Sequence, residues 1–201
     1  MTVATAGSGL KWVGRAIRRL EDPALVTGRG RFTADLPAAH HVRFVRSAVA
    51  SGRIIAITAP AGARIVRADE LGSVGAIRPM LHKFNYQPIE QPLLAKDVVR
   101  FVGEPIAAVV AATPAEAEDL AERVAVEIEE LPAAIDARDA LKPGAPLVHT
   151  NIPTNVVVEG RVKTPGFDTA VAQAHRLVRV DLRSRRQNAT PLEARAAHAA
   201  F

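Results

Sequence analysis

The chain has 201 residues, enough for one full domain and part of a second. Hydrophobic residues make up 48% and charged residues 23%, close to the average for folded domains, which excludes an intrinsically disordered protein. Because cysteine is absent, disulfides, thiolate metal sites, iron–sulfur ligation and a cysteine nucleophile are excluded within this chain.

The net charge of +5 comes from 26 Lys and Arg against 21 Asp and Glu. A basic chain can attract nucleic acid, but aromatic residues, which stack on bases, make up only 4% of this one, so we expect no nucleic-acid partner. No apolar run approaches the roughly 20 residues that span a bilayer, and the N-terminus lacks the apolar stretch of a secretory signal. We therefore expect no membrane partner and a cytoplasmic location.

Residues 9–22 carry apolar side chains at helical spacing with basic side chains between them, which is a short basic amphipathic pattern. Its apolar positions are Leu10, Val13, Ile17 and Leu20. The segment is either a membrane-surface or targeting helix or a leading strap packed on the body of the protein, and the strap is the preferred interpretation. Further on, Gly28 and Gly30 indicate a tight turn or a close backbone approach.

The sequence pattern in the middle of the chain predicts strands on both sides of an irregular segment. Apolar patterns predict strands at residues 41–47 and 53–58, each with one buried face. Residues 60–92, interrupted by proline and glycine, predict a loop-rich insertion. Two more strands are predicted at residues 98–102 and 106–112. The second is almost wholly apolar, as expected of a strand buried on both faces.

A capping box follows these strands. The Thr113 hydroxyl can accept from a free amide of the first helical turn while Glu116 reaches back, which predicts a helix over residues 114–123. Residues 124–129 then alternate with period two, so we expect a strand with its three apolar side chains toward a core and its two glutamates toward water.

The rest of the chain gives weaker signals. Residues 131–148, rich in proline and glycine, predict a connection along a surface. A short helix is predicted to begin at Asp168, and the alternating residues 177–182 predict one more strand. We expect this strand and the residues after Thr190 to leave an open edge or apolar surface.

The chemistry-bearing residues form no recognised catalytic pattern. The six histidines show neither His-x-His nor His-Glu-x-x-His spacing, so a zinc site is not expected, and the pair His40-His41 is interpreted as a solvated loop rather than a ligand set. No Gly-x-Ser-x-Gly elbow supports a Ser-His-Asp triad.

Two glutamates are candidates for proton transfer. Glu104 and Glu193 each lie near proline and apolar residues, where partial burial would disfavour the charged carboxylate. The preferred alternative is a structural carboxylate paired with arginine, with Arg100 and Arg195 as the candidate partners. The residues alone thus indicate an α+β domain with no self-contained catalytic constellation.

Three stretches, in order and at suitable separations, resemble one family. They are Thr27-Gly28-Arg29-Gly30-Arg31-Phe32, Val98-Val99-Arg100-Phe101-Val102-Gly103-Glu104-Pro105 and Pro191-Leu192-Glu193-Ala194-Arg195. The sequence resembles the front part of the molybdopterin-binding large subunits of xanthine dehydrogenase, aldehyde oxidase and aerobic carbon monoxide dehydrogenase. The middle stretch is the most specific and is similar to the heart of the family's α/β hammerhead domain.

The resemblance implies a fold and a division of the chain. The fold is α+β: a hammerhead domain with a mixed sheet and few helices, followed by the start of a molybdenum-cofactor-binding domain. Residues 1–24 would form an N-terminal strap, 25–135 the hammerhead domain, 136–160 a connecting segment and 161–201 the truncated start of the next domain.

The resemblance also implies a function: the N-terminal portion of an oxidoreductase large subunit, a molybdenum hydroxylase, with a structural and subunit-packing role and without complete catalytic machinery. The alternative is a free-standing hammerhead interaction module without redox activity. The family's cofactor-contacting segments are a Gly-Gly-Phe-Gly-Gly loop, a glutamine-bearing loop and a glutamate base near the far C-terminus. None is found in this sequence. We therefore assign no catalytic, cofactor-binding or metal-binding residue to this chain.

Cofactors and partners follow from the same resemblance. This chain alone is expected to bind no cofactor, whereas the complete family enzyme holds molybdenum–molybdopterin, with 2Fe–2S clusters and FAD on partner domains or subunits. The expected partners are the remaining molybdenum-binding domains or a split partner subunit, then iron–sulfur and FAD subunits, with a homo-oligomer as a further possibility.

Overall fold

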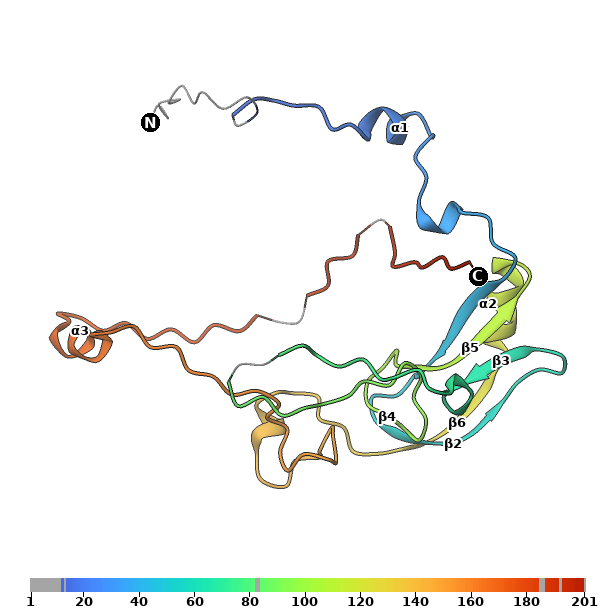
Figure 1. The fold of residues 1–201 in the computed structure, drawn as a ribbon. Helices are drawn as coiled ribbons and strands as arrows, with labels where there is room; N and C mark the ends of the chain where they lie inside the picture. The colour runs from blue at the N-terminus through green and yellow to red at the C-terminus, as the bar shows by residue number, and fades with distance from the viewer. Residues whose placement is uncertain (1–11, 13, 82–83, 185–186, 192, 201) are drawn as a thin grey trace. The chain divides into compact units, whose positions relative to one another are not determined.

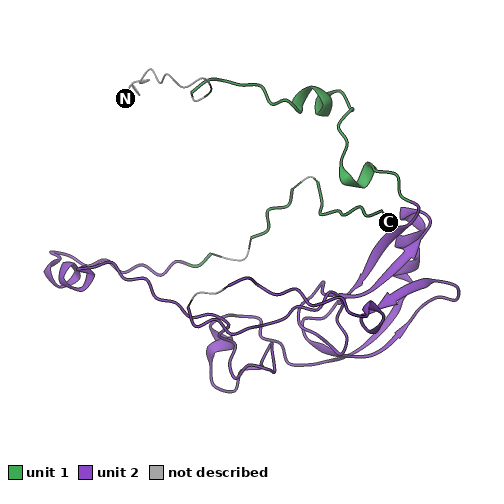
Figure 2. Ribbon diagram, viewed as in Figure 1, with its two compact units in different colours: residues 1–38, 183–201 green, residues 39–182 purple. Residues whose placement is uncertain are grey.

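The computed structural model describes residues 12, 14–81, 84–184, 187–191 and 193–200. The chain divides into two compact units, one of residues 1–38 with 183–201 and one of residues 39–182 (Figure 2). The second unit contains both β-sheets. The predicted boundaries at residues 24, 135 and 160 stay predictions.

The first unit contains the short helix α1 (Asp22–Val26) and the 3-10 turn η1 (Thr33–Asp35). After α1 the backbone turns at Gly28, whose φ is +69° and whose N–H donates to the carbonyl of Leu25. Glycine adopts this conformation at no steric cost. A Cβ on Gly30 would lie 2.8 Å from a methyl carbon of Leu25. Of the two predicted alternatives, the tight turn is therefore confirmed.

The alternative of a helix over residues 9–22 is wrong for its described part, and the preferred strap stays a prediction. The described residues before α1 form no helix, and the side chains of Ile17 and Leu20 are exposed. Such short segments are marginal helices unless an apolar face is buried, and here none is. Leu10 and Val13 lie outside the described residues.

The second unit is built on two antiparallel three-stranded sheets, with strand orders β1-β5-β3 and β4-β2-β6 (Figure 1). The strands are β1 (His41–Arg46), β2 (Gly52–Thr58), β3 (Arg64–Arg67), β4 (Val98–Val99), β5 (Pro105–Ala111) and β6 (Ala125–Glu130). The predicted α+β class is confirmed. The strands form two antiparallel sheets instead of one mixed sheet.

β5 is the central strand of the first sheet, between β1 and β3. Ile106, Ala107 and Val109 are all fully buried. Helix α2 (Pro114–Glu122) packs on β1 and β5. The almost wholly apolar sequence of β5 matches this position, because a central strand with covered faces has no side that water could reach.

The Thr113 cap of α2 forms as predicted, and Glu116 reaches back to Ala112, one residue before the N-cap. The Thr113 hydroxyl accepts from the N–H of Glu116 at 3.1 Å, and the Glu116 carboxylate accepts from the N–H of Ala112 at 3.2 Å. These bonds satisfy donors that a helix start otherwise leaves free. The helix places Ala117, which is fully buried, against the body of the unit.

β6 shows the alternation expected from its sequence. Val126 and Ile128 are partly buried, whereas Glu127 and Glu129 are exposed. Its partner β2 begins at Gly52, where a Cβ would lie 2.3 Å from Cγ2 of Ile128. The two strands approach so closely at this point that only glycine fits.

The core consists of two clusters that share neighbours. One contains Val45, Ala107, Val109 and Val124, and the other contains Ala95, Val99 and Ile106. Ile57 of β2 and Val126 of β6 pack against both clusters. The two sheets are therefore held by one continuous apolar core, in which each buried valine contributes about 1.5–3 kcal/mol relative to an exposed one.

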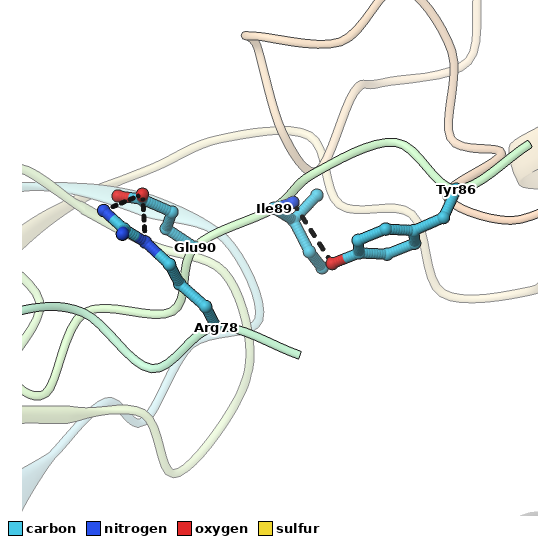
Figure 3. A network of polar contacts seen from close by, with 4 residues as sticks. All are labelled: Arg78, Tyr86, Ile89 and Glu90. Atoms are coloured by element: carbon cyan, nitrogen blue, oxygen red, sulfur yellow. Dashed lines mark hydrogen bonds and ion pairs between the residues drawn. The ribbon is translucent and has the colours of Figure 1, made fainter. Parts of the chain in front are cut away.

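The insertion predicted over residues 60–92 is loop-rich but contains β3 and the turn η2 (Ala68–Leu71), which the prediction lacked. Its later part is held by the pairing of Ile77 with Gln91. Figure 3 shows two further contacts within it. Two guanidinium nitrogens of Arg78 contact one carboxylate oxygen of Glu90 at 2.6 and 2.7 Å, and the Tyr86 hydroxyl accepts from the N–H of Ile89 at 3.4 Å.

After β6 the chain is mostly irregular. It contains η3 (Asp139–Leu141) and α3 (Phe167–Gln173), which begins one residue before the predicted start. Residues 177–182, predicted as a strand, form none, and their four apolar side chains are exposed. An extended segment becomes a strand only when another strand pairs with it, and none of the described strands does so here. Within the described residues, no helix has the length and apolarity that crossing a membrane requires.

Candidate functional site

The segment between β4 and β5 carries the chain from one sheet into the other. It turns at residues 101–104, where the N–H of Glu104 donates to the carbonyl of Phe101 at 3.2 Å. The third residue of this turn, Gly103, has φ +89°. Turns with positive φ at the third position require glycine or asparagine. The Gly103-Glu104-Pro105 signal in the sequence thus marks a crossover between two sheets.

Glu104 is the buried charged group of this crossover, with 1% of its surface exposed. Its carboxylate accepts from the backbone N–H of Arg100 at 2.5 Å. Its main-chain carbonyl accepts from the N–H of Ser47 at 2.9 Å, while the N–H of Gly103 donates to the carbonyl of Ser47 at 2.8 Å. Glu104 therefore fastens the turn to the end of β1. Glu104 thus contacts Arg100 through the backbone amide and not through the guanidinium.

Two residues at the end of β1 complete this junction. Arg46 donates from Nη1 to the carbonyl of Gly103 at 2.8 Å. Ser47 is buried, and its hydroxyl donates to the carbonyl of Val49 at 2.8 Å and accepts from the N–H of the same residue at 3.1 Å. Sequence reasoning missed both residues, because nothing in the pattern of β1 indicates that its end meets a turn more than 50 residues away.

The second candidate carboxylate lies elsewhere. Glu193 is exposed and belongs to the first unit, whereas Glu104 belongs to the second. Among the described residues, no ion pair joins Glu193 to Arg195.

The described histidines are dispersed. His40 is exposed and His41 is partly buried in β1. His198 places Nε2 3.1 Å from the carbonyl oxygen of Pro37 within the first unit. His82 lies outside the described residues. Among those that are described, no three His, Asp or Glu side chains gather into a metal-binding group.

A pocket of about 370 Å³ lies beside the edge of β2 and β4, under the connection that follows β6. Most of its lining is apolar. The lining residues are Ala50, Ser51, Arg53, Val98, Arg100, Leu131, Pro132, Ala134, Pro146, Leu147, Val148 and Thr150. It contains two arginines and no carboxylate, so its charge is positive.

Arg100 is the distinctive residue of this pocket. Its Nη1 donates to the carbonyl of Val98 at 3.3 Å, whereas its Nε is buried without a hydrogen-bond partner. The neighbouring His149 is partly buried, and burial together with the nearby positive charge of Arg100 lowers the pKa of His149. Both effects disfavour the protonated imidazole.

The family model described as "Aldehyde oxidase and xanthine dehydrogenase, a/b hammerhead domain" matches residues 27–132. The chain belongs to this family. The hammerhead domain therefore includes both sheets, helix α2 and the Glu104 crossover, and the resemblance seen in the sequence is confirmed.

Relatives of the hammerhead chain are much longer proteins. The chain is 35% identical over 208 residues to the 6-hydroxypseudooxynicotine dehydrogenase complex subunit gamma of Paenarthrobacter nicotinovorans, a match that covers 96% of this chain and 26% of that protein. It spans about a quarter of the length of the first curated relatives that it matches.

The chain is also similar to solved structures of molybdenum hydroxylases. Quinoline 2-oxidoreductase from Pseudomonas putida 86 is 37% identical, with a TM-score of 0.64, and the match covers 72% of this chain and 19% of that one. A Cu,Mo-CO dehydrogenase is 26% identical, with a TM-score of 0.61 and coverage of 81% and 22%. The chain thus matches the hammerhead domain of molybdenum hydroxylase large subunits.

The family implies a molybdenum cofactor, and the groups that line the pocket at Arg100 do not fit one. The pocket at Arg100 offers two guanidinium groups, two hydroxyls and apolar walls. That set suits an organic anion better than a metal centre, which takes its ligands from carboxylate, imidazole or thiolate groups.

Proposed function

We propose that this chain is the N-terminal, structural portion of a molybdenum hydroxylase large subunit, and that it packs against the parts that hold the cofactor. The observation that supports this best is the family match over residues 27–132, which includes every strand of the two sheets. In this proposal the chain contributes a rigid hammerhead domain and no catalytic residue to an oxidoreductase.

Exposed apolar side chains support a packing role. On β1, Val42 and Phe44 are 50% and 47% exposed. The segment 177–182 exposes Leu177, Val178, Val180 and Leu182, each by more than 60%. Contiguous exposed apolar surface is typical of protein interaction sites. We propose that the remaining domains of the large subunit, or a split partner subunit carrying them, cover these residues.

Cofactors and further partners belong to the same proposal. The molybdenum–molybdopterin cofactor would be bound by the remaining domains, and 2Fe–2S clusters and FAD by partner domains or subunits. The name of one relative, a dehydrogenase complex subunit, supports an assembly of several chains. A homo-oligomer and the cytoplasmic location stay predictions, which mass measurement of the purified assembly and cell fractionation test.

The decisive experiment is purification of the untagged chain from its native host at low salt, with metal analysis and mass spectrometry of the co-eluting proteins. We expect a stoichiometric partner and molybdenum in the same fractions. A metal-free chain that elutes alone would overturn the proposal and favour the free-standing module.

A pair of matched variants tests whether the exposed apolar segment contributes to that assembly. Val180→Ser removes an exposed apolar side chain, whereas Arg179→Ser changes its exposed charged neighbour. We expect the partner to be lost or depleted with the first variant and retained with the second. Equal retention in both would show that this segment does not take part.

A further inference from the structure

The pocket at Arg100 has the features of a ligand site that neither the family match nor the proposed packing role uses. Its volume of about 370 Å³ falls in the range of small-molecule sites, roughly 300–1,000 Å³. The strands β2 and β4 form one wall, and residues 131–150, which return past the sheet, form the other. One wall of the pocket is thus fixed by sheet pairing, and the other is formed by the irregular connection after β6.

The polar groups of the pocket are arranged for an anion. Arg100 has a buried Nε without a partner, and no described carboxylate pairs with its guanidinium. The other arginine of the pocket, Arg53, contacts Glu129 at 3.5 Å and is largely exposed. Because the Nε is buried, an anion in the pocket would reach the guanidinium at its outer nitrogens, and a positive charge that no carboxylate neutralises would attract it.

The apolar lining of the pocket favours an anion that carries an apolar group. Val98, Leu131, Pro146 and Leu147 give the pocket hydrocarbon walls, and it contains no lysine. A phosphate would bring more charge and more acceptors than one available guanidinium can satisfy. A carboxylate has two oxygens that match the planar fork of arginine, and its body can contact the apolar walls.

We propose that this pocket binds a small organic carboxylate with an apolar body, whose oxygens are received by the guanidinium of Arg100. The hydroxyls of Ser51 and Thr150 lie in the lining as further donors. The lowered pKa of His149 fits this picture, because it keeps that neighbouring side chain neutral and leaves Arg100 as the local charge. The site depends on this unit alone and not on the proposed assembly.

Benzoate and its neutral analogue benzamide provide the first test, on the 201-residue chain. Titration of each is followed by the 15N–1H signal of the Arg100 side-chain Nε–H, assigned by its absence in Arg100→Lys. We expect benzoate to shift this signal saturably and benzamide to leave it unmoved. Equal shifts with both compounds, or no saturable shift with benzoate, would overturn the proposal.

Calorimetric titration with variants provides the second test. Arg100→Gln removes the guanidinium charge but keeps the backbone N–H that donates to the Glu104 carboxylate. We expect this variant to weaken benzoate binding by about tenfold or more. Arg43→Gln is the matched control, because Arg43 is an exposed arginine paired with Glu118 outside the pocket. Equal affinity of the two variants would contradict the role of Arg100. If Arg100→Gln does not fold, the NMR titration of the wild-type Nε–H signal with benzoate and benzamide tests the proposal by itself.

Discussion

The carboxylate of Glu104 is buried against the backbone N–H of Arg100, four residues earlier, and so fixes the turn that joins the two sheets. The Glu104 carboxylate accepts the hydrogen bond that a main-chain carbonyl of a neighbouring strand would otherwise accept from the Arg100 N–H. Replacing it should therefore affect stability more than removing a surface ion pair does.

We predict that Glu104→Ala lowers the free energy of unfolding by about 1–3 kcal/mol, because the Arg100 amide is left without its acceptor. Glu104→Gln retains an oxygen acceptor and should cost less. Urea denaturation measures both changes. The control is Glu118→Ala, which breaks the half-exposed pair with Arg43 and should cost less than about 1 kcal/mol. Similar losses for Glu104→Ala and Glu118→Ala would contradict the structural role.

Gly52 allows β2 and β6 to approach each other. A Cβ at this position would lie 2.3 Å from Ile128 Cγ2 and 3.0 Å from the Glu129 carbonyl oxygen. We predict that Gly52→Ala lowers the free energy of unfolding by about 1–3 kcal/mol through overpacking. Gly75→Ala is the control, because no atom lies within 4 Å of its Cβ position. Denaturation midpoints that move equally would show that the strands can adjust.

The N-cap of α2 gives a third prediction. Thr113→Ala removes the acceptor for the Glu116 N–H and should destabilise the domain by about 1 kcal/mol. Thr113→Ser keeps the hydroxyl oxygen and should restore most of that loss. Thermal unfolding followed by circular dichroism distinguishes the two variants. A serine variant as unstable as the alanine variant would mean that the methyl group, and not the hydroxyl, is what matters.

His149 makes stability depend on pH. Burial first, and the charge of Arg100 second, lower the pKa of His149 below its ordinary value, which is about 6.5. The unfolded chain therefore takes up a proton at a higher pH than the folded chain does. The contribution to stability is present above about pH 6.5 and is lost as pH falls through the folded pKa.

We predict a smaller loss of stability on acidification in His149→Gln than in the wild-type chain between about pH 7 and pH 5. Urea midpoints measured at several pH values test this. His175→Gln, at an exposed histidine, should keep the wild-type slope. If both variants show the same slope as the wild-type chain, burial of His149 does not influence folding.

The local elements could be predicted because their signals lie within a few residues. The capping box at Thr113 needs only the next three residues, and the alternation of β6 needs only its own six. β3 was missed because it has four residues, two of them arginine, in a segment rich in proline and glycine. Its pairing with β5 is what makes it a strand.

The candidate site could be predicted only in part. Proximity to proline and apolar residues pointed to Glu104, and the structure buries it. The same reasoning selected Glu193, which is exposed, because neighbouring sequence does not determine which surface a residue meets. The pocket was beyond prediction, since Arg100 and Thr150 are brought together by the return of the chain past β4.

The strand order also determines when this protein can fold during its synthesis. β1, β2 and β3 do not pair with one another, and each finds its partner among β4, β5 and β6. A nascent chain that has emerged only as far as Leu94 thus contains three strand-forming segments and none of their partners, and these segments stay unpaired on the ribosome. Native pairing can begin once β4 and β5 have left the exit tunnel, and it is complete only when β6, which ends at Glu130, has followed. Chaperone demand during translation should therefore be concentrated on its first half.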